Sequence, residues 1–274
     1  MSTVADLHPN QIAEQLTGRP YTSWSAITTY QGCPLRYKLR YFDGLPEESV
    51  SASLVFGGAI HHAAEAHLRE RLMGNPAPTL DALMVAYNGG WQEHEGQQVQ
   101  FGKGDDRNTL DDLARRMLTA FQTSELADPS GTIIGIEEEL TGELVAGVPD
   151  LLARVDLLVD DRDALRLTDL KTARSRWSAE QVQDSAGQLL LYHELTKPIA
   201  EGRPIRLEFA VLTKTKTPEV YRHEVSANPQ QIDRMKRIIE RVWKGIELQL
   251  FYPSPSAMQC PTCPFREACR AWAG

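Results

Sequence analysis

The chain has few cysteines and few aromatic residues, no excess of basic residues and no long apolar run. Among its 274 residues are 4 cysteines, and aromatic residues make up 7%. No stretch approaches the roughly 18 to 20 consecutive apolar residues that span a membrane, so we expect no membrane partner. The first residues, MSTVADLHPNQIAEQL, lack the basic start and apolar centre of a secretion signal. We therefore expect a cytoplasmic protein.

Acidic residues outnumber basic ones, 37 against 29, which gives a formal net charge of -8. Nonspecific binding to nucleic acid is driven by Lys and Arg contacts that release counterions, so this balance argues against a protein that coats nucleic acid. It does not exclude a nucleic-acid enzyme, in which a carboxylate-rich metal site lies inside a locally basic groove. The composition, 42% hydrophobic and 24% charged, is typical of a globular protein with one large or two small domains.

The cysteines are unevenly placed. Cys260, Cys263 and Cys269 follow the spacing C-x-x-C-x-x-x-x-x-C, and Cys33 lies far upstream. In a reducing compartment this favours a metal site or unrelated buried thiols over disulfides. Four thiolates complete either a tetrahedral zinc site or a cubane iron-sulfur cluster, and the spacing by itself leaves both alternatives open.

The sequence predicts five segments that differ in pattern. They are a leader (1–22), an N-terminal helical part with Cys33 (23–73), a helical insertion (74–130), a core of strands and a helix (131–228), and a long helix followed by a Pro- and Cys-rich tail (229–274).

Within these segments the expected elements are helices at 57–73, 178–196 and 229–250 and strands at 132–140, 143–148, 151–159, 164–172, 206–213 and 219–225. Residues 96–108 are expected to form an exposed loop, and the tail is expected to form no regular element by itself.

The polar turn 160–163 is expected to join strands 151–159 and 164–172 as a hairpin. These two strands contain the first sign of chemistry. Asp169 and Lys171 are two residues apart, so their side chains share one face of a strand. Asp156 lies within an apolar run, where a carboxylate is costly unless it is paired, hydrogen-bonded or bound to a cation. Two carboxylates beside a lysine can bind a divalent cation and orient a water for attack on a phosphodiester. D-x-K alone is a weak signal, because it also fits a surface ion pair.

Two helical pairs add polar groups to this centre. His61 and Glu65 are one turn apart on the face of the 57–73 helix that also carries Gly57, whereas His62 lies on the opposite, solvent-facing side. Gln188 and Tyr192 are also one turn apart, among leucines. In isolation each of these residues is equally typical of a hydrogen-bonded polar group in a core.

The order G-x-x-x-H-x-x-x-E, a strand Asp, D-x-K-T and Q-x-x-x-Y resembles the RecB-like branch of the PD-(D/E)xK nuclease superfamily. The resemblance extends from Ser23 to the last cysteine and leaves only 74–130 uncovered. It implies an α/β, restriction-endonuclease-like fold with a mixed sheet flanked by helices, a helical insertion and an iron-sulfur-stapled subdomain of the two chain ends.

The resemblance also implies a Mg²⁺ or Mn²⁺ site and catalytic residues. The implied metal ligands are His61, Asp156, Asp169 and the backbone carbonyl of Leu170. The implied catalytic residues are Asp156, Asp169 and Lys171, with Gln188 and Tyr192 associated with the site and with DNA. Asp150 is an alternative first aspartate, because Pro149-Asp150 spells the nominal PD. We favour Asp156, since Pro149 would interrupt a central strand.

Some members of this branch bind an iron-sulfur cluster through one cysteine in a C-P context near the amino terminus and three near the carboxy terminus. Cys33-Pro34 and Cys260-Pro261 match that layout. The resemblance therefore implies a [4Fe-4S] cluster on Cys33, Cys260, Cys263 and Cys269, with structural zinc as the alternative. Such a cluster would join the chain ends. Its binding would offset the entropy cost of closing the loop between them.

Together these features imply a metal-dependent DNA exonuclease that acts on single-stranded or free DNA ends. It is similar to RecB-like exonucleases and to CRISPR-associated spacer-processing exonucleases, and its partners would be DNA and repair or CRISPR adaptation proteins. A nuclease-dead subunit that binds DNA or a partner through the same fold is the alternative, against which the complete motif set argues. The residues expected to contact DNA, or else to form a solvated surface, are Arg36, Lys38, Arg40, Arg174, Arg176, Lys214 and Lys216.

Overall fold

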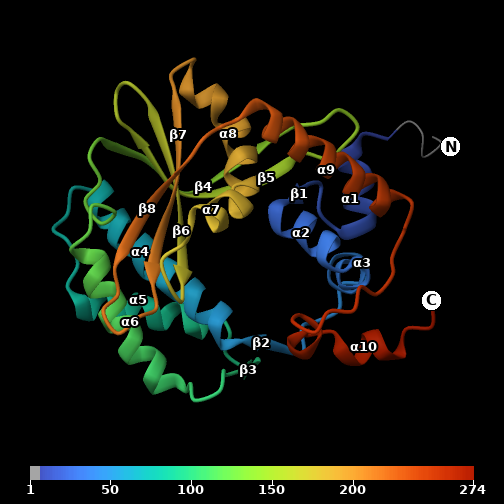
Figure 1. Cartoon of the computed structure of the whole chain (residues 1–274), viewed down its shortest axis with the longest axis horizontal. Coiled ribbons are helices and arrows are strands. Elements are labelled where there is room, and N and C mark those ends of the chain that lie inside the picture. Colours follow the sequence, from blue (N-terminus) through green and yellow to red (C-terminus); the bar gives the residue numbers. More distant parts are fainter. Residues whose placement is uncertain (1–6) are drawn as a thin grey trace. The chain divides into compact units, whose positions relative to one another are not determined.

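The computed structural model describes residues 7–274, so the first six residues of the expected leader lie outside the described part (Figure 1). The chain divides into two compact units. Unit 1 consists of the described residues up to Glu48, together with Glu139–Ala153 and Asn228–Gly274. Unit 2 consists of Ser49–Glu138 and Arg154–Ala227. These two units do not test the expected division into five segments, which stays a prediction.

The elements of unit 2, with the strands that run on into unit 1, are β2 (Ser49–Ser51), α4 (Ala52–Leu72), α5 (Leu80–Gln92), β3 (Gln98–Gln100), α6 (Arg107–Gln122), β4 (Thr132–Gly142), β5 (Leu151–Asp160), β6 (Leu165–Ala173), α7 (Ala179–Ser185), α8 (Gly187–Ala200), β7 (Ile205–Thr213) and β8 (Val220–Val225). The elements of unit 1 are α1 (Pro9–Thr17), β1 (Thr22–Ser23), α2 (Trp24–Gly32), α3 (Pro34–Tyr37), a π-helical turn (Lys38–Phe42), α9 (Pro229–Glu247), a 3-10 turn (Cys260–Thr262) and α10 (Arg266–Ala271).

Unit 2 is built on a mixed sheet. Strand β5 is antiparallel to β6, β6 is parallel to β7, and β7 is antiparallel to β8, while β4 pairs with β5. The polar turn after Asp160 joins β5 to β6 as predicted, because Asp161 N donates to Ala164 O at 3.0 Å. The parallel β6–β7 pair requires a crossover, which α7 and α8 provide. The predicted mixed sheet with flanking helices is therefore confirmed.

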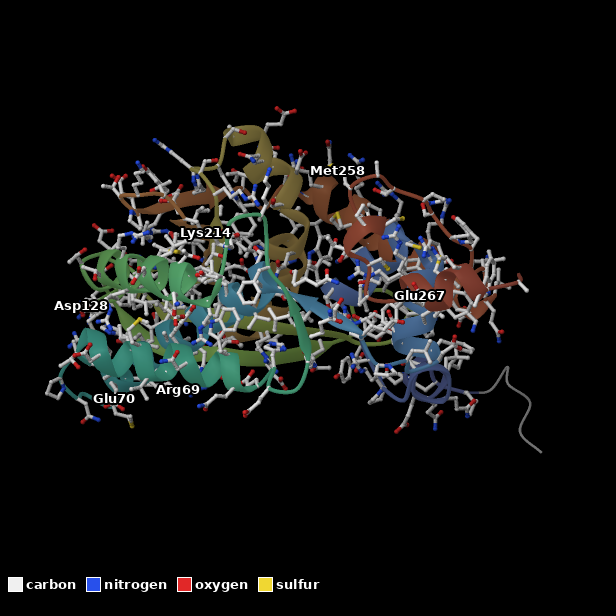
Figure 2. All side chains as sticks on the ribbon, turned by 90° about the horizontal axis from the view of Figure 1, so that it is seen from below. Arg69, Glu70, Asp128, Lys214, Met258 and Glu267 are labelled. Atoms are coloured by element: carbon white, nitrogen blue, oxygen red, sulfur yellow. The ribbon has the colours of Figure 1, made fainter. Side chains whose placement is uncertain are left out.

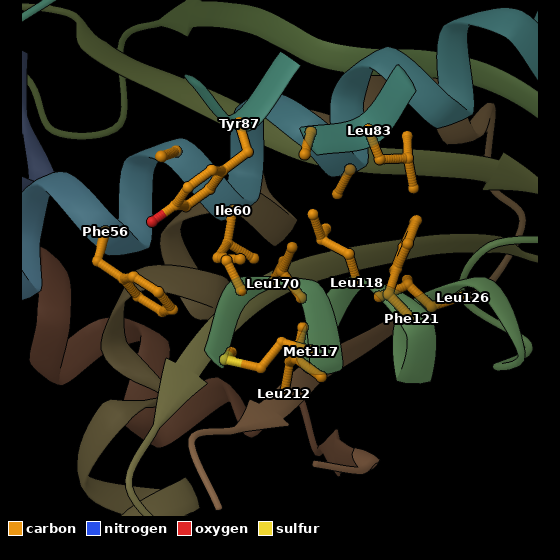
Figure 3. Close-up of a cluster of buried hydrophobic side chains, with 14 of the residues drawn as sticks. Phe56, Ile60, Leu83, Tyr87, Met117, Leu118, Phe121, Leu126, Leu170 and Leu212 are labelled. Atoms are coloured by element: carbon orange, nitrogen blue, oxygen red, sulfur yellow. The ribbon is translucent and has the colours of Figure 1, made fainter. Parts of the chain in front are cut away.

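Alternate residues of the central strands pack against different helices. Leu170, Ala210 and Leu212 join the apolar side chains of α4, α5 and α6 in one core cluster (Figure 3). The side chains that alternate with these, such as Phe209 and Val211, point to the other face of the sheet and are also buried. Helix α8 contacts β6 and β7. Figure 1 shows α4 to α6 on one side of β6–β8 and α8 on the other. Both faces being covered explains why the strands read as continuous apolar runs.

Helix α4 begins five residues before the predicted start at Gly57. Ser51 is its N-cap, with the Ser51 hydroxyl accepting from Leu54 N at 3.3 Å. The earlier turn buries Ala52, Val55 and Phe56 against the cluster, which stabilises the extra residues. The helix therefore carries His61 near its middle rather than near its amino end.

Three expectations about elements are wrong, and the tail gains structure by packing against another part of the chain. Residues 143–148 form turns, with Gly147 at φ 80°, instead of a strand. The helix expected over 178–196 is two helices, α7 and α8, and the second continues through Pro198. The 96–108 loop contains β3, which pairs with β2. The tail forms a 3-10 turn and α10, because Phe265 is buried against Leu35 and Leu39 and gives the tail a core.

An aromatic cluster stabilises unit 1. Tyr37 and Tyr41 are 3% and 8% exposed, and Tyr37 stacks with Phe251 at 6.4 Å between centroids. The Tyr30 hydroxyl donates to Leu250 O at 2.9 Å. Tyr37 and Tyr41 therefore belong to a core of unit 1. No helix of the described residues is both long and apolar enough to cross a membrane.

Gly90 allows helices α4 and α5 to approach each other closely. A Cβ at Gly90 would lie 2.7 Å from Ala59 Cα, whereas a Cβ at Gly58 would meet nothing within 4 Å. We expect Gly90→Ala to lower the free energy of unfolding by about 1–3 kcal/mol through overpacking. The matched Gly58→Ala should raise it by up to about 1 kcal/mol through helix propensity. Urea denaturation measures both, and equal stabilisation by the two substitutions would contradict the close approach.

Candidate active site

The candidate site lies where the pairing of β5 with β6 ends. The recorded pairs run from Asp160–Leu165 to Leu157–Thr168. The next pair would be Asp156 with Asp169, but instead the Asp156 Oδ2 atom accepts the backbone N–H of Leu170 at 2.6 Å. Strand β6 continues beside β7 as far as Ala173. The carboxylate of Asp156 thus takes the place of a backbone acceptor.

This hydrogen bond fixes the direction of the Leu170 carbonyl. In a strand, the N–H and the C=O of one residue point to the same edge. Since the Leu170 N–H points to Asp156, its carbonyl faces the same opening between β5 and β6. The Leu170 side chain is buried in the core cluster and holds the strand in this register. The expected backbone ligand is therefore oriented toward the Asp156 carboxylate.

Lys171 lies between an aspartate and an amide. Its Nζ is 2.7 Å from Asp169 Oδ2 and donates to Gln188 Oε1 at 3.1 Å. Gln188 Nε2 in turn donates to the Tyr192 hydroxyl at 3.0 Å. Asp169 is only 2% exposed, so the ammonium offsets the cost of burying its charge. The structure thus brings together the Asp169, Lys171, Gln188 and Tyr192 that the sequence singled out.

A second group of potential ligands surrounds Asp156. The nearest ligand atoms of His61, Glu137 and Asp156 all lie within 4.8 Å of one another. His61 Nδ1 is 3.6 Å from Asp156 Oδ2. A small cavity of about 20 Å³ adjoins these three residues, which is room for about one water-sized particle. Asp169 is not a member of this group.

Glu137 is the residue that the sequence did not reveal. It has φ 51°, a left-handed conformation that costs a residue other than glycine about 1–2 kcal/mol. It is the first of three consecutive glutamates in β4, and a regular strand would place it on the same face as Glu139, so periodicity does not single it out. Only the local departure from strand geometry places its carboxylate beside His61 and Asp156. Glu65, on the face predicted for His61, lines the same cavity and pairs with Arg69 at 2.7 Å.

The buried charges shift one another's pKa values. Burial, reinforced by the Asp156 charge, raises the pKa of Glu137 to about 7. Burial and the same neighbour raise the pKa of Asp169 to about 6, with Lys171 opposing. For Asp156, burial would raise the pKa, but His61, Lys171 and the Leu170 amide outweigh it and lower the pKa. Mutual repulsion among carboxylates of this kind is relieved by a bound cation.

The alternative aspartate, Asp150, has a different environment. In unit 1 its carboxylate accepts from Asn10 Nδ2 at 3.0 Å, and its backbone N–H donates to Asn10 Oδ1 at 2.8 Å. These paired contacts tie α1 to the start of β5. Asp150 is absent from the ligand group of the described residues.

Several of the expected DNA-contacting residues follow the ends of β6 and β7. These strands are parallel, so Arg174 and Lys214, one residue beyond each, leave the sheet at the same edge. Lys214 Nζ lies 4.9 Å from the centroid of the Phe56 ring, and Arg176 lies 4.8 Å from that of Tyr221. Lys216 is exposed in the following turn.

The other expected cations belong to unit 1. Lys38 pairs with Asp43 at 2.6 Å, and Arg40 pairs with Glu47 at 3.2 Å. Arg36 lines a cavity of about 210 Å³.

That cavity is lined by all four cysteines. Cys33 is the N-cap of α3, and Cys33, Cys263 and Cys269 pack against the small apolar cluster around Phe265. Two backbone amides point at sulfur, since Ser254 N donates to Cys33 Sγ at 3.4 Å and Ser256 N donates to Cys260 Sγ at 3.2 Å. Among the described residues, no three of these sulfurs lie within 4.8 Å of one another. The four cysteines thus surround the cavity, and their sulfurs do not converge on one position. Met258, in the loop between Ser256 and Cys260, is 88% exposed (labelled in Figure 2).

Carboxylates, an imidazole and a lysine around an oriented backbone carbonyl define a candidate site for metal-dependent phosphodiester hydrolysis. The chain belongs to the PD-(D/E)XK nuclease superfamily, whose sequence model matches residues 21–270. Membership indicates a nuclease-type hydrolase.

One solved structure shows the same fold. A crystal structure from Eubacterium rectale, provisionally described as an exonuclease, has a TM-score of 0.58 and covers 99% of this chain and 93% of its own at 14% identity. That likeness concerns the fold alone. The crystal structure of SSO0001 has a TM-score of 0.37 at 16% identity, covering 83% of this chain and 88% of its own, which is too low to support an argument. No curated protein matches the chain.

The raised pKa of Glu137 predicts a pH effect on the metal-free protein. Between about pH 4.5 and 7 the folded state keeps a proton that the unfolded state has lost, so the free energy of unfolding falls as the pH rises. Glu137→Gln should remove this fall and, above pH 7, be more stable than wild type by at most about 3 kcal/mol. Denaturation in EDTA from pH 4.5 to 8 measures it. The exposed neighbour variant Glu138→Gln is the control. A constant difference between Glu137→Gln and wild type over that range would contradict the assignment.

Proposed function

We propose that this nuclease is a cytoplasmic, metal-dependent DNA exonuclease of the RecB-like branch that acts on single-stranded or free DNA ends. One observation carries the proposal. At the end of the β5–β6 pairing, Asp156, the Leu170 carbonyl, and the Asp169–Lys171 ion pair are fixed by backbone geometry and by burial. DNA repair or CRISPR adaptation proteins are the proposed partners.

The proposed ligands of a Mg²⁺ or Mn²⁺ ion are His61, Asp156, Asp169 and the Leu170 carbonyl, and the structure adds Glu137. Oxygen-rich donor sets of this kind suit hard divalent cations. Burial and then the charge of Asp156 raise the pKa values of Glu137 and Asp169, which supports the fit, because a bound cation would offset both effects. When bound, such an ion polarises a phosphodiester and lowers the pKa of a water.

The protein's own groups then position the reaction. Lys171 carries a positive charge held by Asp169 and Gln188, so its ammonium can stabilise an attacking water or the charge that develops on the phosphate. Gln188 is held in turn by Tyr192, and burial raises the pKa of Tyr192 to about 12, so the hydroxyl stays protonated. Gln188 and Tyr192 therefore act by holding Lys171 in place.

DNA would lie along the edge where β6 and β7 end. Arg174, Arg176, Lys214 and Lys216 all follow those strands and can contact phosphates close to Lys171. The lowered pKa of Lys214, caused mainly by burial and then by Arg174, fits a site that lacks its anion. Arg36 and Lys38 remain proposed DNA contacts from unit 1.

We further propose that the four cysteines bind a [4Fe-4S] cluster. A tetrahedral zinc site with Zn–S bonds of about 2.3 Å brings its sulfurs within about 3.8 Å of one another. The wider separation of the cysteine sulfurs and the cavity of about 210 Å³ support a larger group. The buried Arg36 Nε, which has no hydrogen-bond partner among the described residues, supports an anionic one.

The active-site proposal is tested with three variants on single-stranded DNA that is labelled at one end. Lys171→Ala and Asp156→Asn should each lower Mg²⁺-dependent degradation at least about 100-fold, a typical loss for a charge-stabilising group. Asp150→Asn should retain activity, since Asp150 binds Asn10. Gel analysis of the products follows the reaction. Equal inactivity of wild type and Lys171→Ala would favour a nuclease-dead DNA-binding subunit, and loss in Asp150→Asn alone would identify the other aspartate.

Anaerobically purified protein should be brown and contain about four iron atoms per chain, as a cubane cluster requires. Replacing any one of the four cysteines with serine should remove most of the iron, whereas Ser254→Ala should keep it, because Ser254 contributes its backbone amide. Iron and zinc analysis with the visible absorption spectrum measures this. A colourless protein with one zinc would favour the structural zinc site instead.

A further inference from the structure

Among the residues that the structure describes, the cysteine cavity is lined by cations and by no acidic side chain. Besides the four cysteines, its lining includes Arg36, Arg266 and Arg270. Arg266 and Arg270 are exposed, and Arg270 lies 3.6 Å from Glu267 (Figure 2 labels Glu267). Water therefore screens these two charges. Arg36 is less exposed, so its charge acts in a lower dielectric.

Arg36 is also placed by the same turn of helix that carries a cysteine. Cys33 is the N-cap of α3, Arg36 is three residues further on, and both residues line the cavity. Pro34 fixes the first turn, and Leu35 N donates to Tyr252 O at 2.9 Å. The buried Arg36 Nε has no partner among the described residues. A buried guanidinium donor without an acceptor costs free energy, unless an acceptor belongs in the cavity.

We propose that Arg36 donates from Nε to a sulfur of the proposed iron-sulfur cluster and sets its reduction potential. The proposal rests on the cofactor proposed above. Arginine keeps its positive charge and has no acceptor, so its partner must accept a hydrogen bond, and an anionic acceptor gives the strongest one. The backbone amides of Ser254 and Ser256 also donate to sulfur, on Cys33 and Cys260, and would change the reduction potential in the same direction as Arg36.

The direction of the effect follows from charge. Reducing the cluster by one electron adds a negative charge to the cavity. Donors and positive charges beside the sulfurs stabilise the reduced form more than the oxidised form and so raise the potential. Arg36 is thus a tuning residue for the cluster and not a catalytic residue of the nuclease. This role differs from the DNA contact that the sequence pattern suggested for Arg36.

The experiment is a redox titration of the anaerobically purified full chain, followed by EPR of the reduced cluster. The variants are Arg36→Gln, which removes the charge, and Arg36→Lys, which keeps it without the fixed Nε–H. Arg40→Gln is the matched control, because Arg40 pairs with Glu47 and does not line the cavity. Iron content is measured first for every sample.

In Arg36→Gln we expect the ratio of reduced to oxidised cluster at a fixed potential to fall about tenfold, a shift of about 59 mV to more negative potential for one electron. Arg36→Lys should shift less and Arg40→Gln not at all. If Arg36→Gln loses its cluster, the potential of Arg36→Lys and its rate of iron loss to a chelator decide instead, and both should differ from wild type.

Unchanged potentials in iron-replete Arg36→Gln, or in Arg36→Lys together with an unchanged rate of iron loss, would overturn the role of Arg36. Wild-type protein that contains no iron would overturn the cluster itself and this role with it. The iron analysis recognises that outcome before any redox measurement, and it is independent of the nuclease assay.

Discussion

The hydrogen bond from the Leu170 amide to the Asp156 carboxylate is the interaction on which the candidate site depends. It replaces a backbone pair at the point where β5 and β6 would otherwise place two aspartates opposite each other. The same contact satisfies a buried carboxylate, ends the pairing of the two strands and turns the Leu170 carbonyl toward the opening. Three requirements of a metal site are thus met by one side chain in one strand. An apolar residue at 156 would allow the strands to continue pairing and would close the opening.

Burial gives this arrangement its electrostatic character. Asp169 is almost fully buried and is balanced by Lys171, while Glu137 adopts a left-handed conformation beside His61 and Asp156. Each of these features costs stability when the site holds only protein groups. Their concentration around one small cavity is the pattern of a site whose charges are completed by a ligand. The surrounding core of α4, α5 and α6 provides the rigidity that such a strained site needs.

The sequence predicts the strands and the residues at the centre of the candidate site. It does not predict the features that depend on an irregular backbone or on contacts between distant segments. Periodicity located β5, β6 and the hairpin between them, because an apolar strand interrupted by one aspartate is a strong local signal. It placed Asp169 and Lys171 on one face, and the structure brings them to 2.7 Å. It could not distinguish Glu137 from the glutamates that follow, because only an irregular backbone sets Glu137 apart. It also missed the order in the tail, whose α10 depends on Phe265 meeting Leu35 and Leu39 from the other end of the chain.

The way in which the chain passes between the two units has a consequence for synthesis on the ribosome. Unit 2 ends at Ala227, whereas unit 1 draws on residues near both termini and needs Phe265 and Cys269. Every residue proposed to bind the divalent metal has therefore been translated before three of the four cysteines exist. A nascent chain can complete its hydrolytic centre first, and the cysteine cavity can form only after Cys269 has been translated. Premature termination would thus yield fragments that carry the hydrolytic residues without the cysteine pocket.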